Sequence, residues 1–151
     1  MATTLSSGRQ GLLRFQPRRR AQCVLVDVNV AAHELGLHHE EVVEMAECGE
    51  LRWVFDVSVH ANRIRELRFW VGELMRRDAR SMDEAEVLAA VVGHPTEVRL
   101  RGSTVCDVLM LRRPTVHDLM AAHELSGEVV GKTLWVDRRS LVDFLRRRLV
   151  A

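Results

Sequence analysis

Two consecutive arginines stand immediately before a proline that suits the beginning of a helix. Arg112 and Arg113 precede Pro114, whose fixed φ favours the first position of an α-helix. Thr115 and His117 would then project outward from the first turn. A guanidinium at such a helix start can donate two parallel hydrogen bonds to guanine O6 and N7, worth about 1 to 3 kcal/mol of discrimination between bases. The pattern is typical of a helix that reads a groove of duplex DNA, and the alternative for each single charge is a solvated surface position.

More cations follow that could bind phosphates. Lys132 lies at the tip of an expected hairpin, and Arg138 and Arg139 come after it. Cations that displace counterions from DNA lower log K by about 0.9 per log salt for each phosphate neutralised. Residues 1–22 form an expected flexible arm that either lies along DNA or only aids solubility. The candidate DNA-binding residues are Arg112, Arg113, Thr115, His117, Lys132, Arg138, Arg139 and, in the arm, Arg18, Arg19 and Arg20.

The stretch around the arginine pair predicts two helices joined by a tight corner. The first helix would start at Ser103, a hydroxyl that can cap free N–H groups, and the second at Pro114, each with apolar residues at helical spacing. The stretch GEVVGKTLWVDRRSLVDFLRRR that follows reads as a short ribbon and then a last helix, with Ser140 and Asp143 predicting a capping box at the helix start. Helix, corner, helix, ribbon and helix predict a winged helix-turn-helix, a shape associated with the DNA major groove.

The same pattern occurs earlier in the chain. A shift of 74 residues lays residues 26–51 over residues 100–125 without a gap, so that Leu35 falls on Leu109. The match is mostly in apolar positions, part of which any two amphipathic helices would share. After the first copy, the stretches RWVFDVS and RIRELRFWV alternate like two strands, with a longer loop between them than in the second copy. The sequence therefore predicts two related domains.

Short motifs recur at corresponding places in these two copies. The second copy has Thr115-Val116, Glu124-Leu125 and Ser140-Leu-Val-Asp-Phe144-Leu145, and the first has Gly49-Glu50-Leu51. With these motifs the chain resembles the small winged-helix proteins of the excisionase and MerR-like group. His123 stands where that group has glycine, and Glu41-Val42 replaces its Thr-Val in the first copy, which is therefore degenerate. The resemblance implies a DNA-binding transcriptional regulator or recombination accessory factor, with the second copy reading duplex DNA.

These patterns predict an α+β protein, mostly α, with tandem winged helix-turn-helix domains joined by a helical linker. The linker helix would begin with Ser81 and Glu84 as a capping box and end at Gly93. The expected divisions are a flexible basic arm at 1–22, a first, acidic domain at 23–79, the linker at 80–99 and the second domain at 100–151.

The net charge of +1 hides an uneven distribution of charge along the chain. Residues 1–22 contain five arginines and no acid, whereas residues 23–79 contain six basic and eleven acidic residues. Since DNA affinity needs cations at phosphates, the acidic helix of the first domain would instead face solvent, the basic arm or a basic partner. Trp70 is a second candidate contact, because strand alternation opposite Phe69 would make it a dimer surface unless an adjoining element covers it.

The sequence argues against several other classes of protein. It has no Gly-rich phosphate loop and no recognisable nucleophile with its base, so neither catalysis nor a cofactor is expected. His33, His38, His39 and Cys48 lack the paired spacing of a metal site. No run of 18 apolar residues predicts a transmembrane helix, and three scattered cysteines indicate a reducing compartment, so a cytoplasmic protein associated with the nucleoid is expected. The alternative function is a protein-interaction or self-assembling module whose winged folds no longer bind DNA specifically.

Overall fold

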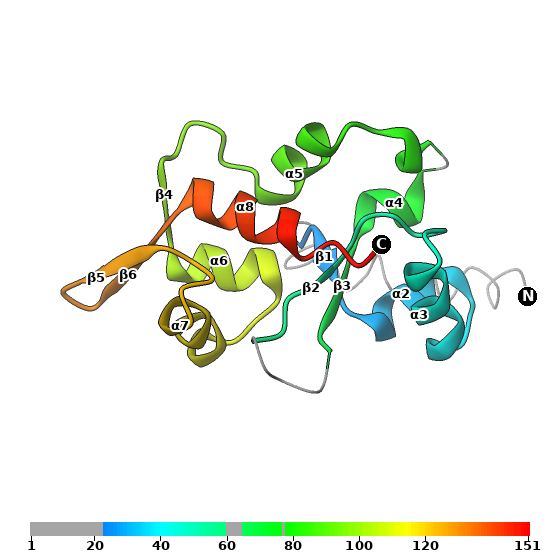
Figure 1. Cartoon of the computed structure of the whole chain (residues 1–151), viewed down its shortest axis with the longest axis horizontal. Coiled ribbons are helices and arrows are strands. Elements are labelled where there is room, and N and C mark those ends of the chain that lie inside the picture. The colour runs from blue at the N-terminus through cyan, green and yellow to red at the C-terminus, as the bar shows by residue number, and fades with distance from the viewer. Residues whose placement is uncertain (1–22, 60–64, 77) are drawn as a thin grey trace, which may run out of the picture.

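The chain forms a mixed α/β fold with two small antiparallel sheets (Figure 1). A computed structural model describes residues 23–59, 65–76 and 78–151, about half of them helical. Sheet A has the strand order β1-β3-β2 and sheet B the order β4-β6-β5. The described elements are β1 (Leu25–Val26), α2 (Val28–Leu35), α3 (His39–Glu47), β2 (Val54–Asp56), β3 (Leu67–Trp70), α4 (Val71–Met75), the 3₁₀ helix η2 (Ala79–Ser81), α5 (Glu84–Val92), β4 (Arg99–Arg101), α6 (Gly102–Leu109), α7 (Arg113–Ala121), β5 (Gly127–Val130), β6 (Thr133–Asp137) and α8 (Arg138–Arg147).

Two successive units share one order of elements. The N-terminal unit runs from β1 to α4 and the C-terminal unit from β4 to α8, each with a strand, two helices, two strands and a helix. In both sheets the third strand of the unit lies between the first and the second. A shift of 74 residues carries the bounds of α2 onto those of α6, and the bounds of α3 onto those of α7. The last two strands are separated in the sequence by residues 57–66 in the N-terminal unit and by Gly131 and Lys132 in the C-terminal unit.

Two helices begin without the serine caps that the sequence suggested. Helix α6 starts one residue before Ser103, after Arg101, and no side chain caps it. Helix α5 starts after Asp83, whose carboxylate accepts a hydrogen bond from the Glu86 amide at 3.3 Å. Ser81 lies in η2, so the expected linker capping box was wrong. Asp83, two residues further along, supplies the carboxylate that accepts from a free amide at the helix start.

The expected capping box at the start of α8 was also wrong. The helix begins at Arg138, so Ser140 lies inside its first turn. The Ser140 hydroxyl donates to the Asp137 carbonyl at 2.8 Å and accepts from the Ser126 amide at 3.1 Å. Ser140 therefore ties the segment before β5 to the start of α8.

Both faces of sheet A are buried. Val26, Val54, Leu67 and Phe69 belong to a core formed with α2 and α3. Leu25, Phe55, Val57 and Trp70 point to the opposite face, into a larger core that includes α5, α8 and the C-terminal unit. Trp70 is only 6% exposed, so of the two alternatives for this residue the structure shows the one in which adjoining elements cover it. The two units share one continuous core at this face.

Residues 148–150 complete the outer edge of sheet A. The Asp56 amide donates to the Arg148 carbonyl at 2.9 Å, and the Val150 amide donates to the Val54 carbonyl at 2.9 Å. Between them Phe55 and Leu149 form an antiparallel bridge. The chain after α8 thereby covers the edge of β2, whose backbone groups would otherwise be open to pairing with another chain.

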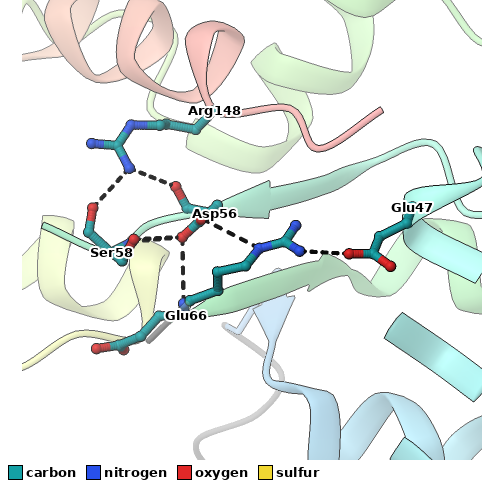
Figure 2. Close-up of polar contacts among 6 residues, drawn as sticks. Glu47, Asp56, Ser58, Glu66 and Arg148 are labelled. Carbon is teal, nitrogen blue, oxygen red and sulfur yellow. Dashed lines mark hydrogen bonds and ion pairs between the residues drawn. The ribbon is translucent and has the colours of Figure 1, made fainter. Parts of the chain in front are cut away.

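An arginine and an aspartate connect this edge to the end of α8 (Figure 2). Arg148 Nη1 donates to the Asp56 carbonyl at 3.0 Å and to the Ser58 carbonyl at 2.7 Å. The Asp56 carboxylate accepts from the Ser58 hydroxyl at 2.7 Å, the Ser58 amide at 3.1 Å and the Glu66 amide at 3.3 Å. Arg65 lies 3.6 Å from the same carboxylate. Partial burial by itself would raise the pKa of Asp56, but the bonds from Ser58 and Glu66 and the charge of Arg65 outweigh it, so the pKa falls below 3.8.

We expect Asp56→Asn to lower the free energy of unfolding by about 1 to 3 kcal/mol near neutral pH, because a hydrogen-bonded carboxylate is lost. The folded-state pKa of Asp56 lies below its unfolded value, so its contribution is present above 3.8 and is lost as the pH falls through the folded-state pKa. Urea unfolding of both proteins at a series of pH values measures this. A difference between them that stays constant below pH 3.8 would contradict the assignment.

Candidate nucleic-acid interface

The first turn of α7 presents its polar side chains to solvent. Arg112 is the residue before the helix, and Pro114 occupies one of the first two helical positions. Arg112, Arg113, Pro114 and His117 are exposed, and Thr115 is half-buried. On the opposite side of the helix, Val116 and Leu119 are fully buried in the larger core. Burial of its apolar side therefore determines which side of α7 faces solvent, and the arginine pair lies at the N-terminal end of the helix.

The start of α7 contacts the tip of the β5–β6 hairpin. Arg113 Nη2 donates to the Lys132 carbonyl at 3.2 Å, and Arg113 Nε lies 3.4 Å from His117 Nε2. Gly131 adopts a φ of 64°, which the tight two-residue turn requires and which glycine adopts readily. The structure thus brings together Arg113, His117 and Lys132 from two elements.

The hairpin projects from the body of the molecule beside α7 (Figure 1). All four residues of β5 are exposed, and β5 forms an outer edge of sheet B. Val129 is 56% exposed and Val130 is 53% exposed, both next to the cationic turn. A narrow, protruding ribbon of this kind can enter a groove or follow a phosphate backbone.

The turns on both sides of α7 contain non-glycine residues with left-handed backbones. Met110, between α6 and α7, has a φ of 53°, and His123, after α7, has a φ of 62°. For a residue with a β-carbon this conformation costs roughly 1 to 2 kcal/mol. The position equivalent to His123 in the N-terminal unit is Gly49, which also has a positive φ, of 85°. Contacts from elsewhere in the fold must hold these turns.

Arginines at the end of α8 hold the turn after α7. Arg147 Nη2 lies 3.2 Å from both the backbone carbonyl and a carboxylate oxygen of Glu124, and Arg148 Nη2 lies 3.3 Å from the other carboxylate oxygen. Partial burial of Glu124 opposes ionisation, but the hydrogen bond from Arg147 and the charge of Arg148 outweigh it and lower the pKa. Arg148 also binds the N-terminal unit at Asp56 and Ser58, so one side chain links that unit to the end of α7.

Arg138 and Arg139 lie apart from the group around α7. Arg138 is half-buried, and its Nε donates to the Gly93 carbonyl at 3.0 Å, which ties α8 to the end of α5. In Figure 1, α5 and α7 lie on opposite sides of α8. Arg138 and the exposed Arg139 line a groove of about 480 Å³ with Glu97, Val98, Val142, Asp143 and Arg146. The structure therefore does not bring these two predicted residues to the arginine pair.

Sequence reasoning missed a basic patch on the outer face of sheet B. The guanidinium carbons of Arg99 and Arg101 lie 5.3 Å and 5.6 Å from the ring centroid of Trp135. Arg99 also forms an ion pair with Glu128 at 3.2 Å, and Glu128 lies on β5 directly opposite Trp135. The alternation Arg-Leu-Arg at residues 99–101 was the available signal, because it places both arginines on one face of a strand.

The N-terminal unit differs from this arrangement at equivalent positions. Glu40 and Glu41 of α3 correspond to Pro114 and Thr115 under the 74-residue shift, and both glutamates are exposed. The edge of β2 is paired with residues 148–150 rather than free like that of β5. The first turn of α3 thus contains two carboxylates, whereas the first turn of α7 contains no acidic residue and begins at Arg113.

Several expectations concern residues or ligands away from this surface. Arg18, Arg19 and Arg20 lie outside the described residues. Within 23–59, 65–76 and 78–151, no group of three or more His, Cys, Asp or Glu side chains is placed to hold a metal ion. Over the same ranges, none of the helices has the length and apolar character needed to cross a bilayer.

We expect Arg113→Ala to loosen the hairpin tip in the free protein. The change removes the hydrogen bond to the Lys132 carbonyl, and an exposed contact of this kind is worth about 0.5 to 1 kcal/mol. Backbone amide relaxation by NMR should show lower order parameters at Gly131 to Thr133. Arg139→Ala removes the same charge far from the hairpin and should leave these values unchanged. Equal mobility in wild type and Arg113→Ala would show that this bond does not restrain the hairpin.

The chain matches no protein-family model, and comparisons with curated proteins and with solved structures give no match.

Proposed function

We propose that this chain is a sequence-specific DNA-binding protein with tandem winged helix-turn-helix units, acting as a transcriptional regulator or recombination accessory factor. In this proposal, α6 and α7 of the C-terminal unit form the helix-turn-helix, and β5 and β6 form its wing. Helix α7 enters the major groove of duplex DNA, which is about as wide as one helix. The N-terminal unit orients the helix-turn-helix of the C-terminal unit and does not contact DNA itself.

The observation that carries the proposal is the uncovered basic end of α7 beside a projecting hairpin. Arg112, Arg113 and Lys132 come together there, and Arg112 and Lys132 are exposed. The residues at the start of a recognition helix are those that reach base edges, while cations at the wing suit phosphates. Arg112 is the candidate base-reading residue, because part of the hydrogen-bonding capacity of Arg113 is directed to Lys132.

The number of cations that contact phosphates sets the expected salt dependence of binding. If Arg113 and Lys132 each neutralise one phosphate while Arg112 contacts a base, log K should fall by about 1.8 per log salt. Arg99 and Arg101, or the arginines of residues 1–22, would make the slope steeper. The acidic N-terminal unit would oppose binding by long-range repulsion, which is strongest at low salt.

We expect the full chain to bind labelled duplex DNA in fluorescence anisotropy titrations at low salt and to release it as salt rises. Arg112→Ala/Arg113→Ala should weaken binding by about tenfold to a hundredfold, because it removes one bidentate base contact and one phosphate contact. The matched control is Arg139→Ala/Arg76→Ala, which removes two exposed arginines outside the proposed surface and should leave affinity within about twofold.

Two outcomes would contradict the proposal in different ways. No binding by the full chain at low salt excludes DNA as the partner of this surface. Binding that survives the double substitution but is lost on deletion of residues 1–22 indicates attachment to the backbone without base reading.

A second candidate function is favoured by the acidic surface of α3. Glu40, Glu41, Glu44 and Glu47 are exposed on this helix, and of these Glu47 pairs with Arg65 at 2.7 Å. In this alternative the winged units form a protein-interaction module, and α3 binds a basic partner. Absence of DNA binding together with an undisturbed fold would favour this function.

A further inference from the structure

The turn between α6 and α7 has the same backbone form as its counterpart in the N-terminal unit but a different residue. The left-handed position is Gly36 in the N-terminal unit, with a φ of 69°, and Met110 in the C-terminal unit, with a φ of 53°. In both turns the next amide reaches back to the helix, from Leu37 to Ala32 and from Leu111 to Cys106, each at 3.0 Å. Glycine holds this conformation readily, whereas methionine is strained in it.

A buried arginine of the N-terminal unit contacts this strained turn. Arg68 lies in β3 and is 8% exposed. Its Nε donates to the Leu109 carbonyl at 2.9 Å, and its Nη2 donates to the Met110 carbonyl at 2.9 Å. Arg68 Nη1 donates to the Leu67 carbonyl at 3.0 Å. The carboxylate of Glu66, 3.2 Å from Nη2, balances the charge of the guanidinium. The guanidinium therefore caps the last carbonyls of α6, where a positive charge also complements the helix dipole.

We infer that Arg68 is a positioning residue for α7, through which the N-terminal unit sets the corner of the helix-turn-helix in the C-terminal unit. Arg112 follows Met110 by two residues, so the backbone angle at Met110 directs the start of α7. Arg68 stabilises that angle from outside the unit, which allows methionine to stand where the N-terminal unit needs glycine. The inference gives the N-terminal unit a role in the proposed DNA binding, and so rests on that function only for its effect on affinity.

The corner itself can be tested in the free full-length chain by hydrogen exchange. Arg68→Ala should speed amide exchange at Leu111 and neighbouring residues by roughly tenfold, because two carbonyls and a strained turn lose their partner. Met110→Gly removes the strain, so the double variant Arg68→Ala/Met110→Gly should regain most of the protection. Arg65→Ala is the matched control, since it removes an exposed arginine that precedes β3 and pairs with Glu47 and Asp56 rather than with the turn.

Rescue by glycine distinguishes positioning from a general loss of stability. Circular dichroism shows whether Arg68→Ala folds. Arg68→Lys is a milder variant that keeps the positive charge but has too few donors in the right geometry to bond both the Leu109 and Met110 carbonyls as arginine does. If the double variant exchanges as fast as Arg68→Ala, or if Arg68→Lys and Arg68→Ala both exchange like wild type, Arg68 does not hold the corner and the inference is wrong.

DNA titrations add a second readout. Arg68→Ala should weaken binding by roughly tenfold without changing the salt slope, because Arg68 neutralises no phosphate, whereas Lys132→Ala should reduce the slope by about 0.9. Met110→Gly should restore the affinity of Arg68→Ala. If the wild-type chain binds no DNA, the proposed function fails while the exchange experiment still decides whether Arg68 positions α7.

Discussion

The face of sheet A that packs against the C-terminal unit is apolar, and its burial determines how the two units fit together. Phe55 and Trp70 lie on this face with Leu25, and burying an aromatic side chain stabilises a fold by about 3 kcal/mol. Helix α5 and the C-terminal unit, including α8, cover this face. Once that face is covered, Arg68 faces the end of α6 and Arg148 faces β2. The polar contacts between the units are consequences of this apolar packing.

Equivalent positions in the two sheets show how similar units came to differ. Leu25 pairs with Trp70 in sheet A, and Arg99 pairs with Asp137 at the corresponding place in sheet B. Similarly, Phe55 pairs with Arg68, and Glu128 pairs with Trp135. Apolar residues in the first unit thus correspond largely to charged residues in the second. One sheet face forms a contact within the molecule, and the other stays open beside the hairpin.

The sequence predicted local structure well where periodicity and turn chemistry act within a few residues. The spacing of Val116 and Leu119 and the position of Pro114 predicted the orientation of α7, and the 74-residue shift relates the helices of the two units. Alternation correctly placed Phe69 and Trp70 on opposite faces, but it could not show that another element covers Trp70. That information depends on residues far away in the chain.

The contacts of the candidate site were the least predictable part for the same physical reason. Arg68 binds carbonyls 41 and 42 residues away, and Arg148 binds carbonyls 92 and 90 residues away. Backbone carbonyls occur at every residue, so no side-chain pattern marks these partners. Arg147 ends α8 and Arg148 follows it, and only the folded chain shows that both contact Glu124 in the turn after α7. Arg138 looked like a phosphate ligand because it follows the hairpin, yet its guanidinium binds the end of α5.

The pairing of residues 148–150 with β2 has a consequence for biosynthesis. The edge of β2 becomes paired only after the ribosome has made residues 148–150, more than ninety residues downstream of it. The N-terminal unit must therefore wait, with the edge of β2 and the aromatic face of sheet A uncovered, until residues 148–150 have been made. During that interval a nascent chain carries an aggregation-prone surface, and slow elongation or a truncated product would prolong its exposure to chaperones and proteases.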